Sequence, residues 1–276
     1  MTPPLVQLER VSKRYEVARR PGSAVSGEET GLQAVTDFTL DVGAGEFVSI
    51  IGPSGCGKST VLFLLAGLRP PSGGRVEVCG QPAAKATRSE LASVIFQQPV
   101  LFEWLTVEDN VLLPLRMRDS RWWAWPLRRR DYAARAREAL ATVELDGFAH
   151  YRPDALSGGM QQRVAIARAD AGAPRPAARR AVRRPRRAES PPHDQELLRL
   201  WEERGLSIVF VTHSIEEAVY LSDRVVVMGR PRADRTGGSI VRIIDVELPR
   251  PRRLAVKEEV AFFQKVRGGR EALRDA

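Results

Sequence analysis

The chemistry of this sequence shows most plainly in one run of residues, which reads Gly52, Pro53, Ser54, Gly55, Cys56, Gly57, Lys58, Ser59 and Thr60. The run matches the G-x-x-x-x-G-K-[ST] pattern of a phosphate-binding loop. Glycines let backbone N–H groups curl around phosphate oxygens without Cβ clashes, and a following helix N-terminus adds a favourable dipole. Lys58 is expected to reach the β- and γ-phosphates, and the Ser59 hydroxyl to ligate Mg²⁺. The run therefore predicts nucleotide binding.

The residues around this loop predict the elements that position it. A dense β-branched run at residues 46–51 predicts a strand before the loop, and residues 59–65 carry the apolar spacing of a helix. Further strands are expected at residues 5–11, 34–40, 75–78, 93–96, 207–212 and 224–228, helices at residues 131–143 and 159–169, and a short hairpin at residues 238–246 before a final helix. Alternating strands and helices favour a parallel sheet.

Composition and length predict a globular chain. Of its 276 residues 43% are hydrophobic, which is ample for a buried core. The longest apolar run, residues 61–68, is far shorter than the roughly 18 residues of a membrane-spanning helix, and the N-terminus does not show a signal-peptide pattern. Cys56 and Cys79 have neither metal-ligand spacing nor a disulfide framework. These features predict a protein of a reducing compartment, either cytosolic or peripheral to a membrane.

A second motif, Leu-Ser-Gly-Gly-Met-Gln-Gln-Arg, occupies residues 156–163. Ser157 followed by Gly158 and Gly159 at a helix start makes another oxyanion site, although the chain already has its phosphate loop. An ordinary N-capped helix would explain the serine and the glycines but not the whole octet. The octet resembles the signature sequence of the ABC ATPases. The resemblance implies that Ser157, Gly158, Gly159 and Gln161 close over the γ-phosphate of an ATP held by a second subunit.

Other residues occur in the order that this family shows. Gln97, after the apolar residues 94–96, matches the glutamine that contacts Mg²⁺ and the attacking water. His213 matches the switch histidine at the γ-phosphate, and Tyr15 matches the aromatic residue that stacks on adenine. Taken singly, each is typical of an ordinary surface or structural residue. Their joint order and spacing carry the resemblance.

Residues 102–115, 212–229 and 248–252 look like the nitrate, sulfonate and taurine branch of ABC importers. The resemblance covers about residues 5–168 and 194–253. It implies an α/β fold, a P-loop NTPase of ABC type with a mixed sheet core, a small antiparallel β subdomain and an inserted helical subdomain at about residues 99–154. The ABC domain would span residues 1–253, and residues 254–276 would form a C-terminal tail helix.

The implied function is that of a subunit that binds and hydrolyses ATP with Mg²⁺ to energise import of a small anionic solute of nitrate, sulfonate or taurine type. The implied partners are a second copy of the same subunit, an integral membrane permease and, indirectly, a substrate-binding protein. The implied location is the cytoplasmic face of the cell membrane, as a peripheral protein. Nucleic acid is not among the expected partners.

One segment departs from the family pattern. The family has an apolar strand ending in Asp-Glu, the Walker B motif, where this chain has the anomalous segment of residues 170–193. Within it, residues 170–189 carry seven Arg against two acidic residues, which is a large share of the chain's net charge of +9. No acid there can hold Mg²⁺ or polarise the attacking water. Two alternatives to an active ATPase follow: a non-hydrolysing or defective ATP-binding protein, and an arginine-rich nucleic-acid-binding module.

The genetic code offers an explanation for this segment. The codons of residues 176–189 can be read in a frame shifted by one nucleotide, with free choice only at degenerate third codon positions. The shifted frame then permits Leu-Leu-Leu-Asp-Glu-Pro-Phe-Gly-Ala-Leu-Asp-Ala-Leu, which is the missing family segment. We therefore predict that sequencing the coding DNA across codons 166–200 reveals a missing or extra base near codons 169–170 and another near codons 193–194. A shifted frame that does not encode Asp-Glu would refute this hypothesis.

Overall fold

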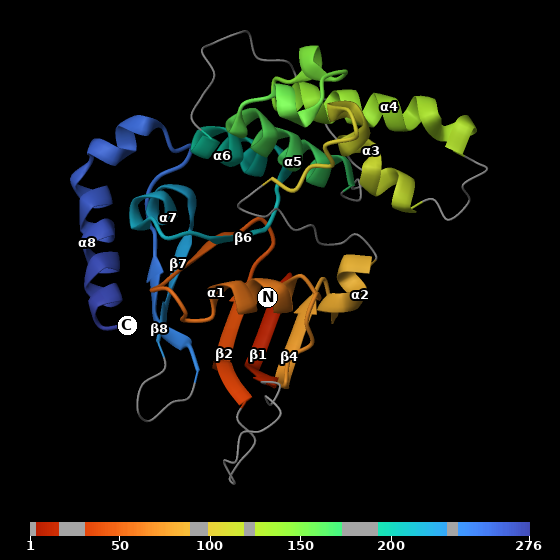
Figure 1. Cartoon of the computed structure of the whole chain (residues 1–276). Helices are drawn as coiled ribbons and strands as arrows, with labels where there is room; N and C mark the ends of the chain where they lie inside the picture. Colours follow the sequence, from red (N-terminus) through yellow and green to blue (C-terminus); the bar gives the residue numbers. More distant parts are fainter. Residues whose placement is uncertain (1–3, 17–30, 89–98, 119–124, 173–192, 231–236) are drawn as a thin grey trace. The chain divides into compact units, whose positions relative to one another are not determined.

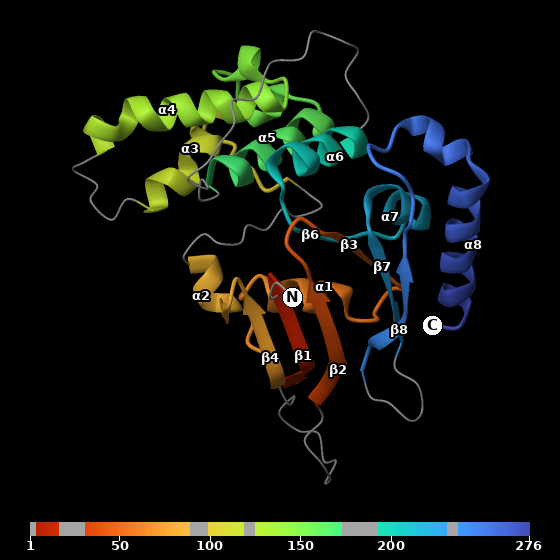
Figure 2. The ribbon, with the colours of Figure 1, turned by 180° about the vertical axis from the view of Figure 1, so that it is seen from behind.

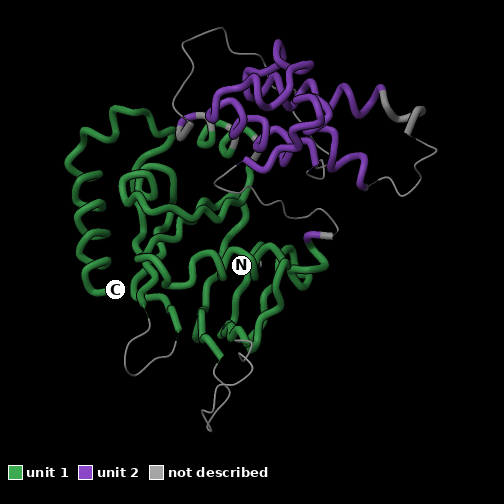
Figure 3. Tube along the Cα trace, viewed as in Figure 1, with its two compact units in different colours: residues 1–86, 197–276 green, residues 87–196 purple. Residues whose placement is uncertain are grey.

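The computed structural model describes residues 4–16, 31–88, 99–118, 125–172, 193–230 and 237–276. The chain divides into two compact units, coloured in Figure 3. The first unit joins Met1–Ala86 to Leu197–Ala276, and the second comprises Thr87–Glu196.

The first unit contains a mixed sheet with the strand order β6-β3-β7-β8. Strand β3 (Phe47–Ile51) is buried at every residue and pairs in parallel with β6 (Ile208–Val211) and with β7 (Arg224–Gly229). Its sequence, apolar except for the buried Ser49, is typical of a parallel strand covered on both faces. Strand β8 (Ser239–Asp245) runs antiparallel to β7. The hairpin expected at residues 238–246 is therefore wrong, because these residues form one strand whose partner is β7.

A second sheet in the same unit is antiparallel throughout, with the order β2-β1-β4-β5. Its strands are β1 (Val6–Glu16), β2 (Gly31–Val42), β4 (Gly73–Val78) and β5 (Gln81–Pro82). At the start of β1 the alternate residues Val6 and Leu8 are buried, whereas Gln7 and Glu9 are only partly buried, as expected for a sheet that covers the core with one face. The alternation shifts at the exposed Arg10, where the strand is irregular, and Val11 is the next buried residue. The mixed core sheet and the small antiparallel sheet thus agree with the fold that the resemblance implied.

Helices cover the mixed sheet (Figures 1 and 2). The helices α7 (Ile215–Leu221) and α8 (Val260–Arg274) pack against each other and against β7. Helix α8 buries Phe262, Val266, Gly269 and Ala272, whose spacing places them along one side of the helix. From α6 (His193–Arg204), Trp201 packs edge-on against Phe47 with 6.1 Å between ring centroids.

In its described residues the second unit is helical. The helices α3 (Val107–Arg118), α4 (Trp125–Thr142) and α5 (Gly158–Gly172) pack on one another, and along the chain the first unit ends within the short helix α2 (Ala83–Arg88). The buried Asn110 side chain accepts a hydrogen bond from the Phe102 backbone N–H at 2.9 Å and donates to the Phe102 carbonyl at 3.1 Å, which fixes the turn before α3. None of the helices in the described ranges combines the length and apolar character that crossing a membrane requires.

The segment of residues 248–252, the proline–arginine tail, is anchored by the buried guanidinium of Arg252. The Arg252 side chain is 1% exposed and donates to the carbonyl oxygens of Val219 at 3.2 Å, Tyr220 at 3.0 Å and Ser222 at 2.7 Å, which lie at the end of α7. Helix C-termini leave such carbonyls without intrahelical partners, so the arginine satisfies them. Burial, together with the charge of Arg250, lowers the pKa of Arg252 to about 10, so the group stays charged at neutral pH.

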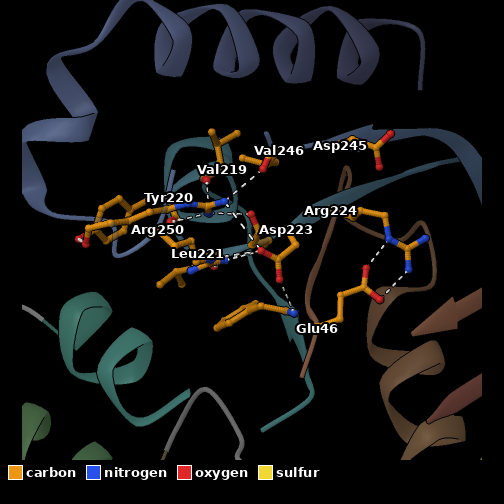
Figure 4. A network of polar contacts seen from close by, with 12 residues as sticks. Glu46, Val219, Tyr220, Leu221, Asp223, Arg224, Asp245, Val246 and Arg250 are labelled. Atoms are coloured by element: carbon orange, nitrogen blue, oxygen red, sulfur yellow. Dashed lines mark hydrogen bonds and ion pairs between the residues drawn. The ribbon is translucent and has the colours of Figure 1, made fainter. Parts of the chain in front are cut away.

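Asp223 connects this tail to the strand that leads into the phosphate loop (Figure 4). One carboxylate oxygen accepts from the Phe47 backbone N–H at 2.9 Å, and the other accepts from Arg250 at 2.7 Å. The Arg250 guanidinium also lies 4.0 Å from the centroid of the Trp201 ring. The tail, α6 and the beginning of β3 are therefore held by one polar cluster.

Replacing Arg252 with alanine should lower the free energy of unfolding by about 3 kcal/mol, because the buried carbonyl oxygens that it satisfies lose their partner. The matched control is Arg253→Ala at the neighbouring exposed position, which should change stability by less than about 0.5 kcal/mol. Urea unfolding of both variants measures the difference. Equal stability of the two variants would contradict the structural role given to Arg252.

Candidate nucleotide-binding site

The phosphate loop occupies the turn between β3 and α1 (Lys58–Leu65). Because β3 runs parallel to both β6 and β7, the loop starts at the carboxyl edge of these strands, where α/β sheets bind ligands. Ser54 and Gly55 are exposed at the tip of the loop, whereas Cys56 is fully buried beneath it. The strand, loop and helix expected from the sequence are all present.

The loop glycines are required by close main-chain contacts. Gly57 has φ +94°, and a Cβ there would lie 2.5 Å from the carbonyl oxygen of Ala34. A Cβ on Gly52 would lie 2.5 Å from the carbonyl oxygen of Met228. Any side chain at either position would force the loop away from β2 or β7. The glycines of the motif thus set the shape of the loop as well as its openness to a ligand.

Lys58 holds the loop from within. The residue is 5% exposed, and its ammonium donates to the carbonyl oxygens of Gly52 and Pro53, both at 2.8 Å. The same nitrogen lies 3.7 Å from the Cys56 sulfur. A positive charge is therefore fixed across the mouth of the loop, where a phosphate oxygen could replace a carbonyl as its partner.

The first turn of α1 is open to an anion. Gly57 occupies the N-cap position, no side chain caps the helix, and its first turn carries no acidic residue. The exposed Ser59 and the half-buried Thr60 lie in that turn. Free N–H groups with a helix dipole favour bound phosphate. Within the described ranges no group of three or more His, Cys, Asp and Glu residues could hold a metal ion.

His213 follows β6 at the same sheet edge as the loop. The Thr212 backbone N–H donates to the Ile50 carbonyl at 3.3 Å, so the chain after β6 runs beside the end of β3. The His213 side chain itself is exposed. Its expected contact with the γ-phosphate stays a prediction that this position permits.

Tyr15 lies on the antiparallel sheet of the same unit. Its half-buried ring is on β1, opposite Leu32 of β2, with the Lys13 ammonium 5.3 Å from the ring centroid. Strand β2 also contributes Ala34, whose carbonyl lies against the loop glycine 57. The strand β2 therefore connects the proposed adenine contact with the phosphate loop, and stacking by Tyr15 stays a prediction.

The signature residues lie at the start of α5 in the helical unit. The Ser157 hydroxyl accepts from the Met160 backbone N–H at 3.3 Å, so it caps the helix, and Ser157 and Gly158 are exposed while Gly159 is half-buried. The Gln161 amide donates to the Pro153 carbonyl at 2.8 Å, which fixes the preceding turn. These contacts are local ones, and the contact of these residues with ATP stays a prediction.

Three expected features lie outside the described residues. The strand expected at residues 93–96 and Gln97 fall in residues 89–98, and the arginine-rich run falls in residues 173–192. The loop's main-chain partners, Ala34, Met228 and Gly238, were missed from the sequence. Backbone groups leave no sequence signature, although the pair Gly237-Gly238 was a visible signal of close packing.

The comparisons with known proteins agree with this geometry. Residues 35–175 match the ABC transporter family. An ATP-binding protein of Brucella abortus is 41% identical over 235 residues, which is 84% of each chain. An aliphatic sulfonates import ATP-binding protein of Bacillus cereus is 36% identical, covering 87% of this chain and 88% of the relative. A taurine import ATP-binding protein of Burkholderia thailandensis is 36% identical, covering 88% and 83%.

Solved structures show the same architecture. The dimeric ATP-binding cassette MJ0796, bound to ADP and phosphate after hydrolysis, aligns with a TM-score of 0.63 and 30% identity over 88% of this chain and 100% of that chain. The structure of cbiO1 from Clostridium perfringens aligns with a TM-score of 0.66, covering 98% and 99%, and at 20% identity it supports the fold alone.

The fold and the loop together define a P-loop nucleotide-binding protein. The chain belongs to the ABC transporter family, as an ATP-binding subunit of the branch that includes the sulfonate and taurine proteins.

Lys58→Ala should weaken ATP binding about 10- to 100-fold, because a charge-assisted hydrogen bond to phosphate is lost. Lys85→Ala, at an exposed position of α2, is the matched control and should bind like the unaltered protein. Equilibrium titration with a fluorescent ATP analogue measures both affinities. Unchanged binding by the Lys58 variant would place the nucleotide elsewhere.

Proposed function

We propose that this chain is the ATP-binding subunit of an importer for a small anionic solute of nitrate, sulfonate or taurine type. The observation that carries the proposal is the phosphate loop, in which the Lys58 ammonium is fixed among loop carbonyls at the mouth of an uncapped helix N-terminus. Relatives named as aliphatic sulfonates and taurine import proteins support the solute class. ATP would bind with Mg²⁺, with Ser59 and Gln97 as the proposed metal contacts.

The proposed partners follow from the same relatives. A second copy of the chain would supply Ser157 and its neighbouring glycines to the first copy's ATP, an arrangement supported by the dimeric state of a structural relative. An integral membrane permease would provide the pathway, fed indirectly by a substrate-binding protein. The subunit would then work at the cytoplasmic face of the membrane as a peripheral protein.

Hydrolysis by the chain as printed is a separate question, because the arginine-rich run replaces the acidic pair that the family uses. The family match ends at residue 175, within this segment. In the described part of the chain, β6 pairs with β3 alone, and none of its apolar residues is buried. An apolar strand of this kind is typical of a sheet interior flanked by further strands. This half-exposed edge supports the hypothesis that a strand of the family is replaced here.

The restored reading frame provides the test. A variant in which residues 176–188 are replaced by Leu-Leu-Leu-Asp-Glu-Pro-Phe-Gly-Ala-Leu-Asp-Ala-Leu should hydrolyse ATP at least about 100-fold faster than the printed chain, because it regains the acid that polarises the attacking water. The matched control carries the restored segment with glutamine in place of the glutamate of the Asp-Glu pair, and it should bind ATP but hydrolyse slowly. The rate of phosphate release is measured for the printed chain, the restored variant and the glutamine control, after mass spectrometry has verified the mass of each protein. Equal turnover by the printed and restored chains would contradict the assignment of the acidic pair.

The alternative of an arginine-rich nucleic-acid-binding module rests on residues outside the described ranges, and the named relatives do not favour it.

A further inference from the structure

A glycine that is not part of the phosphate-loop motif lies directly against the loop backbone. A Cβ built on Gly238 would lie 1.8 Å from the carbonyl oxygen of Cys56 and 2.7 Å from its carbonyl carbon. Even weak carbon–oxygen contacts occur at about 3.3 Å or more. No side chain fits at residue 238 unless the Cys56 peptide moves.

Gly238 is also held from its other side, so it cannot easily retreat from the loop. Its N–H donates to the Ala34 carbonyl at 3.1 Å, and its own carbonyl accepts from the Thr36 N–H at 2.9 Å. These bonds form a parallel bridge between Gly238 and Val35 of β2. Strands β2 and β8 lie side by side in Figures 1 and 2. Gly238 is thus fixed between β2 and the loop.

The same junction confines the next residue of the loop. The Ala34 carbonyl that accepts from Gly238 also lies 2.5 Å from the position of a Cβ on Gly57. Gly237 brings the chain into this junction with φ +118°, a conformation that favours glycine, and a Cβ there would lie 2.5 Å from the Thr36 hydroxyl oxygen. Main-chain atoms of β2 and of residues 237–238 therefore surround the peptide that joins Cys56 to Gly57.

We infer that Gly238 is a positioning residue for nucleotide binding, acting through the Cys56 peptide. That peptide precedes Lys58 and the free N–H groups of α1, so its placement decides where a phosphate finds its donors. Gly238 is hydrogen-bonded to β2, and β2 pairs with β1, the strand of Tyr15. Gly238 therefore also fixes the position of the phosphate loop relative to Tyr15, the proposed adenine contact. The inference rests on the proposed nucleotide site and extends it to a residue beyond the motif.

The test compares Gly238→Ala with Gly268→Ala, a control in α8 where a Cβ would meet no atom within 4 Å. Trinitrophenyl-ATP and trinitrophenyl-AMP report affinity, thermal unfolding reports stability, and hydrogen exchange of peptides covering residues 52–65 reports the loop. Gly238→Ala should bind the ATP analogue about tenfold or more weakly, change less toward the AMP analogue, and exchange faster in the loop. Gly268→Ala should match the unaltered protein.

The outcomes separate the inference from the function beneath it. Unchanged ATP-analogue affinity with unchanged loop exchange in Gly238→Ala would overturn the inference, and so would an equal loss for both analogues that follows a lowered Tm. If the unaltered protein binds neither analogue, the proposed function fails. Hydrogen exchange of residues 52–65 in the nucleotide-free protein then still tests whether Gly238 holds the Cys56 peptide in place. Should Gly238→Ala not fold, Gly237→Ala strains the same turn without placing an atom against Cys56, and it should show the same pattern in smaller measure.

Discussion

The nucleotide site depends on main-chain atoms packed at distances that no side chain permits. The phosphate loop contacts the Met228 carbonyl through Gly52 and the Ala34 carbonyl through Gly57. Because neighbouring strands supply these carbonyls, the loop takes its shape from the sheet as much as from its own sequence. The Lys58 ammonium then closes the loop by bonding to two of its own carbonyls. A rigid cradle of this kind loses little conformational freedom when a phosphate binds.

The sheet is in turn held by a cluster far along the chain. Asp223 joins the first residue of β3 to the tail residue Arg250, and the buried Arg252 satisfies the carbonyls at the end of α7. Buried charges are tolerated where hydrogen bonds surround them, and here each bond also fixes a segment to the core. The proline–arginine tail, whose sequence resembles the importer branch, therefore helps to position β3 and, through β3, the phosphate loop.

Strong local patterns made much of the fold predictable. The β-branched run of residues 46–51, the glycine-rich loop and the helical spacing after it all lie in one stretch of chain, so short-range rules place them. The edge strand β8 was mistaken for a hairpin, because its partner β7 is set by tertiary pairing that residues 238–246 do not encode locally. The role of Ala34 could not be predicted either, since a backbone carbonyl is present at every residue and only the fold selects which one touches the loop. The pair Gly237-Gly238 signals close packing, but only the fold shows that Gly238 packs against the phosphate loop.

A structure of the protein crystallised with MgATP would test the account most directly. We expect triphosphate oxygens within hydrogen-bond distance of backbone N–H groups in residues 55–60, with the Lys58 ammonium turned from the Gly52 and Pro53 carbonyls toward the β- and γ-phosphates. We also expect the Cys56 peptide to stay against Gly238. A nucleotide bound away from this loop, or a loop that leaves Gly238 to accept it, would contradict the account.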